Sequence, residues 1–366
     1  MDIAKATEKY EAWLGERIPL IRADLEQKHR LMAEAPFPFF RATYYRWAQT
    51  WPEISPDSAT AIQALGIGDL HVENFGTWRD SEGRLIWGIN DFDEVSRIPY
   101  TGDLVRLAAS AHLAIAAEHI SIDPEQACQA ILEGYHEGLA SGGRAFVLAE
   151  HHTALRQMAV ERLKNPEAFW LKLNGLKTWR GKLPSGAAKG LKRALPDGRL
   201  DFRVVHRVSG LGSLGRRRFV ALTDWHGGTI AREAKELTDS AWYWARPRRR
   251  SPGILYQQAL DRVRRCPDPF VSVRGRWVVR RLAPDCSRIE LASLPSRHDA
   301  FKLLQAMGFE TGNMHLGSVP AIAIEADLKK RTRRWLDRAA TAMVEFVIKD
   351  WTDWRDRNKI GSPHRT

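Results

Sequence analysis

Two short polar motifs, joined by a segment with the pattern of a β-hairpin, constrain the fold of this chain most strongly. The first is GDLHVENFG at residues 68–76, and the second is NDFDE at residues 90–94. Between them, NFGTW and GRLIWGIND flank RDSEGR, which has the composition of a tight turn. A hairpin brings its two ends together, so we expect the two motifs to be neighbours. Either motif alone is an ordinary polar turn, because Asp and Asn are common turn residues.

Taken together, the two motifs have the layout needed for magnesium-assisted phosphoryl transfer. Asp69 would stand at the hydroxyl group of the acceptor, as a base or an orienting group. Mg²⁺ prefers a small number of hard oxygen ligands, which Asn74, Asp91 and Asp93 would supply. The sequence therefore predicts a catalytic Asp69 beside a metal held by Asn74, Asp91 and Asp93.

A glycine-rich motif, SGLGSLG at residues 209–215, lies between FRVVHRV and RRRFVAL. A strand, a glycine turn and a returning strand allow backbone N–H groups to approach phosphates closely. A strand follows the turn here, whereas a helix follows it in the dinucleotide-binding fingerprint. The residues that we expect to bind a nucleotide are Gly210, Gly212, Ser213 and Gly215.

Lys235, in TIAREAKEL, lies where the next strand would place a lysine that pairs with phosphates. The alternative is a solvent-facing residue on a charged strand. A kinase lysine normally pairs with a glutamate on the following helix. No glutamate occurs between Glu236 and Glu290, so that partner is missing or replaced.

The periodicity of the chain predicts an α+β fold. We expect a helix over 3–34 that Pro36 and Pro38 end, and a buried aromatic segment, FPFFRATYYRW. A lysine- and glycine-rich boundary at 174–202 precedes a predicted antiparallel sheet at 202–283. Further helices are expected at 103–119, 124–140, 144–173, 297–315 and 325–354.

The order of these parts differs from that of an ordinary kinase, in which the glycine loop and lysine precede the catalytic loop. Here the catalytic motifs come first. The order suggests a circularly permuted, bilobal protein-kinase-like fold with a mainly helical lobe and a small antiparallel β lobe. The predicted units are 1–180 with the catalytic loop and metal hairpin, 203–283 as the nucleotide-binding lobe, and 297–366 as helices returning to the first unit.

These motifs resemble the bacterial family catalogued as domain of unknown function 2252, from about PFPFFRA to the C-terminal helices. They also resemble the aminoglycoside and choline phosphotransferase group, whose loop reads roughly HGDLHxxN and whose metal motif reads IDFxD. Ile67 stands where that group has its first histidine. The resemblance implies a catalytic Asp69, Asn74 and Asp91 as metal ligands and Asp93 as an auxiliary ligand. It also implies that Asp103 is the helix-capping residue that braces the catalytic loop.

Composition and charge limit the class of protein. The 366-residue chain has 56 basic and 44 acidic residues, a net charge of +12. The excess is concentrated at 172–218, which suits anions, whereas the stretch 69–94 is acidic and suits cations. The N-terminal pattern is not that of a secretory signal, no apolar run approaches ~18 residues, and Cys128, Cys266 and Cys286 form no CxxC pair. We therefore expect a cytoplasmic protein that does not enter a membrane.

The function that we expect is an ATP- and Mg²⁺-dependent phosphotransferase that acts on an unknown, small-molecule hydroxyl acceptor. The missing glutamate partner leaves open a nucleotidyl transferase or a nucleotide-binding pseudokinase. A metal-dependent phosphoesterase would use Asp69, His71, Asp91 and Asp93, with Asn313 and His315 as distant recruits. Nucleic-acid binding through 172–218 and RPRRRS at 246–251 is not favoured, because no recognisable motif is present. Of the other polar residues, we expect His71 to be a structural hydrogen-bonder, Glu73 to face solvent, and Arg280 and Arg281 to reach either the cleft or the surface.

Overall fold

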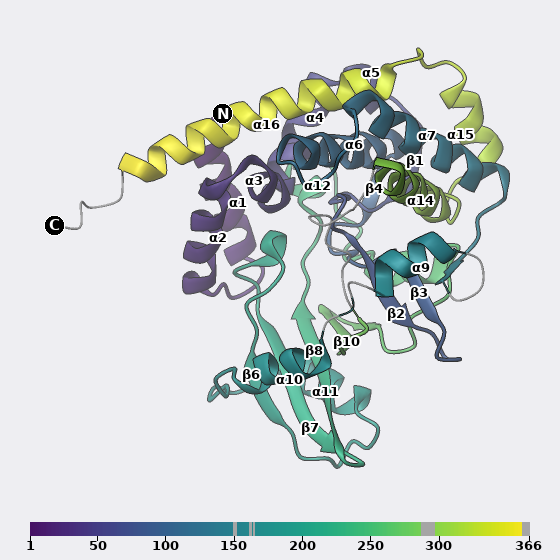
Figure 1. Ribbon diagram of the computed structural model, residues 1–366. Coiled ribbons are helices and arrows are strands. Elements are labelled where there is room, and N and C mark those ends of the chain that lie inside the picture. Colours follow the sequence, from purple (N-terminus) through teal and green to yellow (C-terminus); the bar gives the residue numbers. More distant parts are fainter. Residues whose placement is uncertain (149–151, 161–162, 164, 287–296, 361–366) are drawn as a thin grey trace.

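Helices gather on one side of the molecule and a five-stranded sheet extends from them on the other, as Figure 1 shows. The computed structural model describes residues 1–148, 152–160, 163, 165–286 and 297–360. Its mixture of helices with small antiparallel sheets confirms the α+β prediction. Among these residues, no helix is both long enough and apolar enough to cross a membrane.

The helical part is built from both ends of the chain. Helix α14 packs against α7, and α16 packs against α6 and α2, so late helices cover early ones. The helices of this part are α1 (Ile3–Gly15), α2 (Arg22–Glu34), α3 (Pro36–Ala42), α4 (Tyr44–Ile54), α5 (Pro56–Ala59), α6 (Tyr100–Ala116), α7 (Pro124–Ala140), α9 (Thr153–Val160), α12 (Ala241–Trp244), α13 (Tyr256–Arg262), α14 (Arg297–His315), α15 (Ala321–Leu328) and α16 (Trp335–Ile360).

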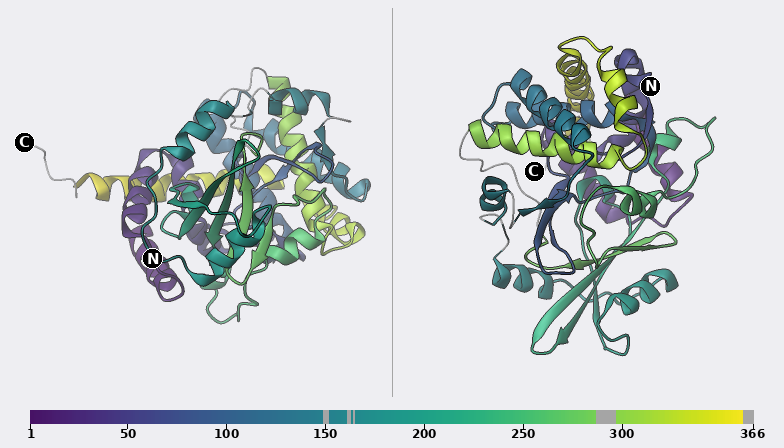
Figure 2. Two further views of the ribbon diagram at one scale, coloured as in Figure 1. Left: turned by 90° about the horizontal axis from the view of Figure 1, so that it is seen from below. Right: turned by 90° about the vertical axis from the view of Figure 1, so that its right-hand side faces the viewer.

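The five-stranded sheet is antiparallel, as predicted, and its strand order is β6-β7-β8-β10-β9. The strands are β6 (Arg203–His206), β7 (Arg218–Trp225), β8 (Gly228–Glu236), β9 (Ser272–Arg274) and β10 (Trp277–Leu282). Side chains alternate between its two faces. Phe219 and Ala221 pack on helix α11 (Ser185–Ala194), whereas Val220 and Leu222 pack on the side of α10 (Pro166–Asn174). The two views of Figure 2 show this sheet with its covering helices.

Two pairs of short strands hold the polar motifs side by side. The predicted hairpin consists of β2 (Phe75–Arg79) and β3 (Leu85–Ile89), and β5 (Phe146–Val147) extends it. Outside it, β1 (Gln63–Gly66) pairs with β4 (Ser96–Pro99). Residues 68–74 therefore lie in the connection from β1 to β2, and residues 90–94 lie in the connection from β3 to β4. This second pairing, which we did not predict, brackets both motifs.

Several predicted helix boundaries are wrong. The helix expected over 3–34 is two helices, because Pro19 lies between α1 and α2 and lacks the N–H that a helix interior needs. Pro36 opens α3 rather than only ending a helix, since proline is well accommodated in a first turn. The range 325–354 also holds two helices, separated by the basic run 329–334, where like charges would repel at helical spacing.

Two further segments differ from their predicted structure. The helix expected over 144–173 contains β5, α9 and α10, and part of it lies outside the described residues. The predicted boundary at 174–202 contains α11. Its buried residues are Ala187, Gly190 and Leu191, whose spacing is helical but whose small size gives a weak apolar signal.

Candidate active site

The first polar motif, residues 68–76, is anchored by a buried carboxylate of α6. Asp103 is fully buried and accepts hydrogen bonds from the backbone N–H groups of Ile67 at 2.7 Å and Gly68 at 2.8 Å. It lies in the first turn of α6 but does not cap that helix, whose N-terminal flanking residue is Pro99. The loop-bracing role implied by resemblance is therefore present, whereas the helix-capping part of it is wrong.

Loss of the Asp103 carboxylate would leave two buried N–H groups without an acceptor. We expect Asp103→Ala to lower the free energy of unfolding by roughly 2–6 kcal/mol in urea denaturation, since each of the two unsatisfied buried groups costs about 1–3 kcal/mol. Asp123→Ala is the matched control, because Asp123 also accepts from two backbone N–H groups but at the exposed start of α7. Its loss should cost about 1 kcal/mol. Equal losses in the two variants would contradict this role for Asp103.

Asp69 is held by an arginine that the sequence analysis did not assign to the site. Arg106 of α6 is fully buried and donates to Oδ1 of Asp69 from Nε at 3.0 Å and Nη2 at 2.5 Å. The guanidinium group lies 4.0 Å from the ring centre of Phe40 and also donates to the Phe40 carbonyl. Arg106 is a charged residue within a mainly apolar helical segment. That position was the sequence feature that could have identified Arg106 as a site residue.

The second oxygen of Asp69 lies toward the glycine motif. A Cβ atom placed on Gly212 would come 3.3 Å from Asp69 Oδ2 and 3.1 Å from the Arg41 carbonyl oxygen. Gly215 is needed for a different reason, because its φ of +94° suits glycine and a Cβ atom there would meet Leu25. The absence of a side chain at Gly212 thus lets residues 210–215 approach Asp69 closely.

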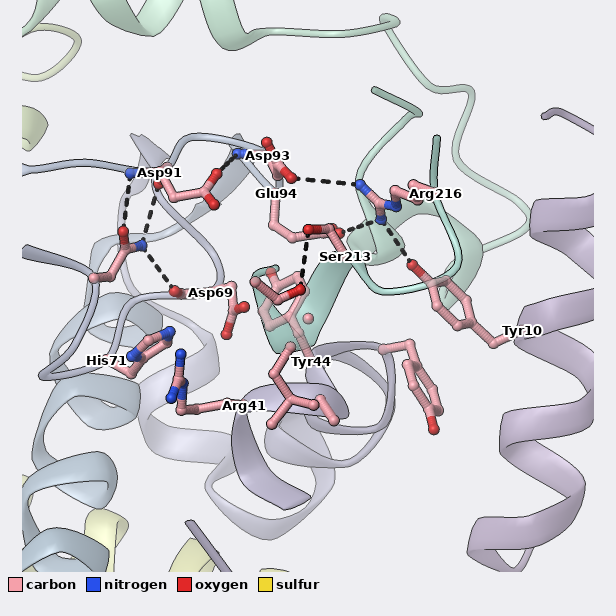
Figure 3. A pocket seen from close by; sticks show the side chains of 16 residues that line it. Tyr10, Arg41, Tyr44, Asp69, His71, Asp91, Asp93, Glu94, Ser213 and Arg216 are labelled. Atoms are coloured by element: carbon pink, nitrogen blue, oxygen red, sulfur yellow. Dashed lines mark hydrogen bonds and ion pairs between the residues drawn. The ribbon is translucent and has the colours of Figure 1, made fainter. Parts of the chain in front are cut away.

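One cleft contains most of the predicted site residues, as Figure 3 shows. Its lining includes the predicted Asp69, Asn74, Asp91, Asp93, Gly210, Gly212 and Ser213. It also includes residues that the sequence analysis missed, namely Tyr10, Arg41, Tyr44, Tyr45, Glu94 and Arg216. Gly215 does not line the cleft, but it ends the same loop. The structure thus brings together two motifs that lie far apart in the sequence.

Asn74 joins the two polar motifs. Its Nδ2 donates to the carbonyl oxygens of Asp69 and Asp91, both at 3.1 Å, and its Oδ1 accepts from the Asp91 N–H at 2.9 Å. An amide oxygen has two lone pairs, so Oδ1 retains capacity for a metal. The structure therefore shows that the Asn74 side chain links the backbones of the two polar motifs. Its role as a metal ligand stays a prediction.

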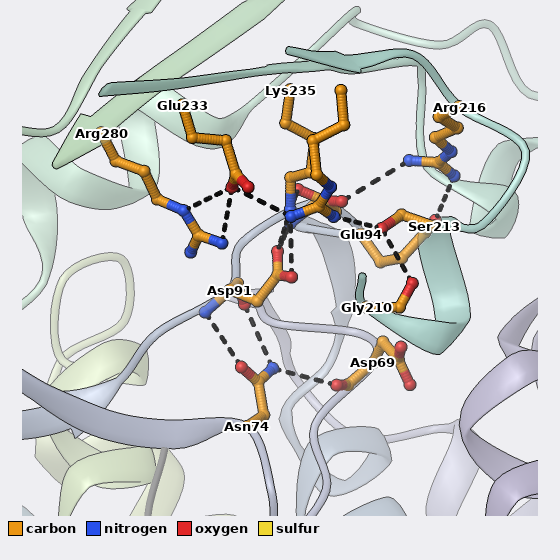
Figure 4. Close-up of polar contacts among 12 residues, drawn as sticks. Asp69, Asn74, Asp91, Glu94, Gly210, Ser213, Arg216, Glu233, Lys235 and Arg280 are labelled. Carbon is orange, nitrogen blue, oxygen red and sulfur yellow. Dashed lines mark hydrogen bonds and ion pairs between the residues drawn. The ribbon is translucent and has the colours of Figure 1, made fainter. Parts of the chain in front are cut away.

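Lys235 reaches the metal motif from the sheet. Its Nζ lies 3.1 Å from both carboxylate oxygens of Asp91 and 2.6 Å from Oδ1 of Asp93, as Figure 4 shows for Asp91. Its side chain is only 2% exposed, so the solvent-facing alternative is wrong. Among the described residues, the carboxylates that pair with Lys235 are thus those of two aspartates and not of a glutamate. One ammonium group neutralises only one of these two carboxylates.

Asp93 is the more buried of the two carboxylates. Burial and the neighbouring Asp91 raise the pKa of Asp93 to about 6, against the attraction of Lys235 and Arg216. Two half-buried carboxylates and an amide oxygen facing one cleft form a donor set that fits a magnesium ion. The residues that would hold such an ion are Asp91, Asp93 and Asn74.

Arg216 closes the other end of the cleft. It donates from Nη2 to Oε1 of Glu94 at 3.0 Å and to the Tyr10 hydroxyl at 3.3 Å. The Glu94 carboxylate also accepts from the Ala241 N–H at 2.7 Å. These contacts tie the second polar motif to the strand that follows the glycine loop and to helix α1.

Helix α2 fixes the glycine motif from outside the cleft. Lys28 is buried, and its Nζ donates to the Gly212 carbonyl at 3.4 Å. Burial lowers the pKa of Lys28 to about 8. Ile21 donates to the Gly215 carbonyl at 2.8 Å, so the middle and the end of the motif are attached to the segment that carries α2.

Several secondary residues take structural positions. His71 accepts at Nδ1 from the Glu73 N–H at 3.2 Å and also lines the cleft, so its assignment as a structural hydrogen-bonder stays a prediction. Glu73 pairs with Arg41 rather than simply facing solvent. His315 contacts Asp103 and Tyr135 behind the loop, and Asn313 contacts Glu310, so neither lines the cleft. The distant histidine needed by the phosphoesterase alternative therefore lies elsewhere.

Glu310 of α14 supports the strand that leads to Asp91. It is fully buried and accepts from the Ile89 N–H at 3.3 Å and from Asn313 Nδ2 at 2.7 Å. Burial raises the pKa of Glu310 from 4.5 to about 7, although Arg265 opposes the shift. Between pH 4.5 and 7 the Glu310 carboxyl is therefore mainly protonated in the folded protein and mainly ionised in the unfolded chain.

This shift predicts that the Glu310 contribution to stability is greatest at low pH. Because the folded-state pKa is the higher one, the contribution falls as pH rises from 4.5 through 7, by about 3 kcal/mol at most. We expect the stability of the wild type relative to Glu310→Gln, measured by urea denaturation, to be lower at pH 8 than at pH 5. A difference that is constant with pH, or that grows in the wild type's favour, would contradict the shift.

Comparison with known proteins gives one match. The family described as an uncharacterized protein conserved in bacteria (DUF2252) matches residues 20–171, which include both polar motifs. The expected resemblance to this family is therefore confirmed for that segment, whereas the glycine motif and the C-terminal helices lie outside it. No curated protein and no solved structure was found to match the chain.

Proposed function

We propose that this protein is an ATP- and Mg²⁺-dependent phosphotransferase that acts on the hydroxyl group of a small molecule. The observation that carries the proposal is the meeting of Gly212, Asp69 and the Asp91–Asp93 pair at one cleft. Phosphoryl transfer depends mainly on positioning and on charge stabilisation. In this proposal Gly212 belongs to the loop that binds the nucleotide, Asp69 is the residue that faces the acceptor hydroxyl, and Asp91 and Asp93 are the metal ligands. We further propose that the chain is a circularly permuted member of the protein-kinase-like fold.

In this proposal the residues on one side of the cleft position the acceptor hydroxyl, and those on the other side hold the phosphates and the metal. Arg106 fixes one oxygen of Asp69, so the other can accept the proton of the acceptor hydroxyl. The hydroxyl oxygen would bond to the terminal phosphorus as the bond from that phosphorus to the ADP oxygen breaks, and ADP would leave. The backbone of residues 210–215 would hold the phosphates. A bound Mg²⁺ would neutralise charge on the phosphates, and Asp91, Asp93 and Asn74 would hold it.

A nucleotidyl transfer is the second candidate, and one observation favours it. Lys235 pairs with Asp91 and Asp93, so the lysine–glutamate pair of ordinary kinases has no counterpart here. Mass analysis of the products from ATP and a pool of small hydroxyl compounds would separate the two chemistries. An acceptor carrying a phosphate supports phosphoryl transfer, and an acceptor carrying AMP supports nucleotidyl transfer.

The proposal predicts that Mg–ATP raises the melting temperature by a few degrees, since a ligand at 100 times its Kd adds about 2.7 kcal/mol. Asp91→Asn should abolish the magnesium-dependent part of this rise. The variant should still fold, because Asp93 remains as the partner of Lys235. Glu82→Gln, in the exposed turn of the same hairpin, is the control and should behave as the wild type. No rise in the wild type, or an equal rise in Asp91→Asn, would refute the proposal.

A further inference from the structure

A cluster of arginines lies beside the metal motif and has no part in the mechanism above. Three guanidinium groups converge on Glu233 of β8. Arg207, which follows β6, donates to it at 2.6 Å, Arg218 of β7 at 2.9 Å, and Arg280 of β10 at 2.9 Å. The cluster therefore spans four strands of the sheet. Figure 4 shows Arg280 and Glu233 on one side of Asp91, and Asp69 on the other.

The charges of this cluster do not balance. Glu233 is fully buried and supplies one negative charge to three guanidinium groups, which holds the pKa of Glu233 well below its ordinary value. Burial, together with repulsion from Arg218 and Arg280, lowers the pKa of Arg207. Asp91 also attracts Arg280, but Lys235 shares that carboxylate. Together with Lys235 these cations number four, against the three carboxylates of Glu233, Asp91 and Asp93, so one positive charge is in surplus. Buried charge without a partner is costly.

The surplus grows when a metal binds. Lys235 stands two residues after Glu233 on the same face of β8, and its present partners are Asp91 and Asp93. A divalent cation on those two aspartates would compete with the ammonium group for them. Lys235 would then add its charge to that of the three arginines. An anion next to the metal would offset this excess.

We propose that Arg207, Arg218 and Arg280 form a second phosphate-binding subsite beside Asp91 and Asp93. Arginine suits phosphate because its planar group can donate two parallel hydrogen bonds. The side chains of Arg207 and Arg280 are 21% and 15% exposed, so an anion can reach them. Arg218, only 4% exposed, links the subsite to the glycine motif through a 2.8 Å hydrogen bond to Ser213 Oγ. The subsite deepens the proposed function and rests on it.

A phosphate in this subsite can have one of two sources. It can be a phosphate of the nucleotide, and the phosphates of the nucleotide would then extend from the metal toward the sheet. It can instead be a phosphate carried by the acceptor. Both sources present the same chemistry to the arginines, and competition with Mg–ATP separates them.

Calorimetric titration with tripolyphosphate, without divalent metal, tests the subsite. We expect the wild type to bind it and Arg280→Gln to bind about tenfold more weakly or worse, since a charge-assisted hydrogen bond is lost. Arg280→Gln should still fold, because two arginines remain for Glu233. Arg207→Gln provides a second variant. Arg274→Gln, at an exposed position of the same sheet, is the control and should bind as the wild type does.

The outcomes separate this subsite from the proposed function. Asp91→Asn should bind tripolyphosphate at least as tightly as the wild type, although it loses the response to Mg–ATP. Displacement of tripolyphosphate by Mg–ATP assigns the subsite to the nucleotide, and binding alongside Mg–ATP assigns it to the acceptor. Equal binding by Arg280→Gln and Arg274→Gln, or no binding by the wild type, would overturn the subsite.

Discussion

Asp69→Asn is expected to lower kcat by roughly 10²–10⁴-fold while leaving the stabilisation by Mg–ATP in place. The carboxylate is the acceptor of the hydroxyl proton in our proposal, and an amide cannot take that proton. The amide oxygen can still accept from Arg106, which is fully buried and would otherwise lose its partner. Release of ADP from Mg–ATP, in the presence of a pool of small hydroxyl compounds, measures the rate.

Two comparison variants make this result specific. Asp69→Ala removes the carboxylate partner of Arg106 and leaves it only the Phe40 carbonyl among its shown acceptors, so it should also lose about 3–5 kcal/mol of stability, the cost of breaking a buried ion pair. Glu73→Gln lies in the same loop, and its carboxylate pairs with Arg41, so its rate should stay within a few-fold of the wild type. A rate unaffected by Asp69→Asn would remove this residue from the chemistry.

Glu233→Gln is expected to lower the free energy of unfolding by about 3–5 kcal/mol. Within the part of the chain that the structure describes, the substitution removes the only carboxylate to which Arg207, Arg218 and Arg280 donate, and it leaves three close positive charges. Urea denaturation at neutral pH measures the loss.

The matched control for this variant is Glu236→Gln, three residues along the same strand. Glu236 is also fully buried, but it pairs with the single guanidinium group of Arg217, with two contacts of 2.7 Å. The side chain of Arg217 is 23% exposed and can turn toward water, so the loss should be smaller. Added tripolyphosphate should restore part of the stability of Glu233→Gln but not that of Glu236→Gln. The reverse order of losses would contradict the surplus of charge at Glu233.

The parts of the site that could be predicted from the sequence depend on local structure. A hairpin must bring its two ends together, so the proximity of Asn74 to Asp91 followed from turn chemistry. The close approach of Gly212 to Asp69 joins two segments that are distant in the sequence, and only the analogy with kinases suggested it.

The parts that could not be predicted depend on tertiary contacts. Arg106 binds Asp69 because a helix packs behind the loop, and helical periodicity does not identify which loop lies there. Lys235 was expected at phosphates, yet its partners are the aspartates of the hairpin. The arginines on Glu233 come from different strands, so their convergence depends on the strand register.

Crystals grown with Mn²⁺ and ATP, analysed by anomalous scattering from the metal, test the central claim most directly. The account predicts a manganese peak within coordination distance of carboxylate oxygens of Asp91 and Asp93, on the side of the cleft that faces residues 210–215. A manganese peak at another group, such as His112, Cys128 and Asp337, whose ligand atoms lie within 4.8 Å of one another, with none at Asp91, would contradict it.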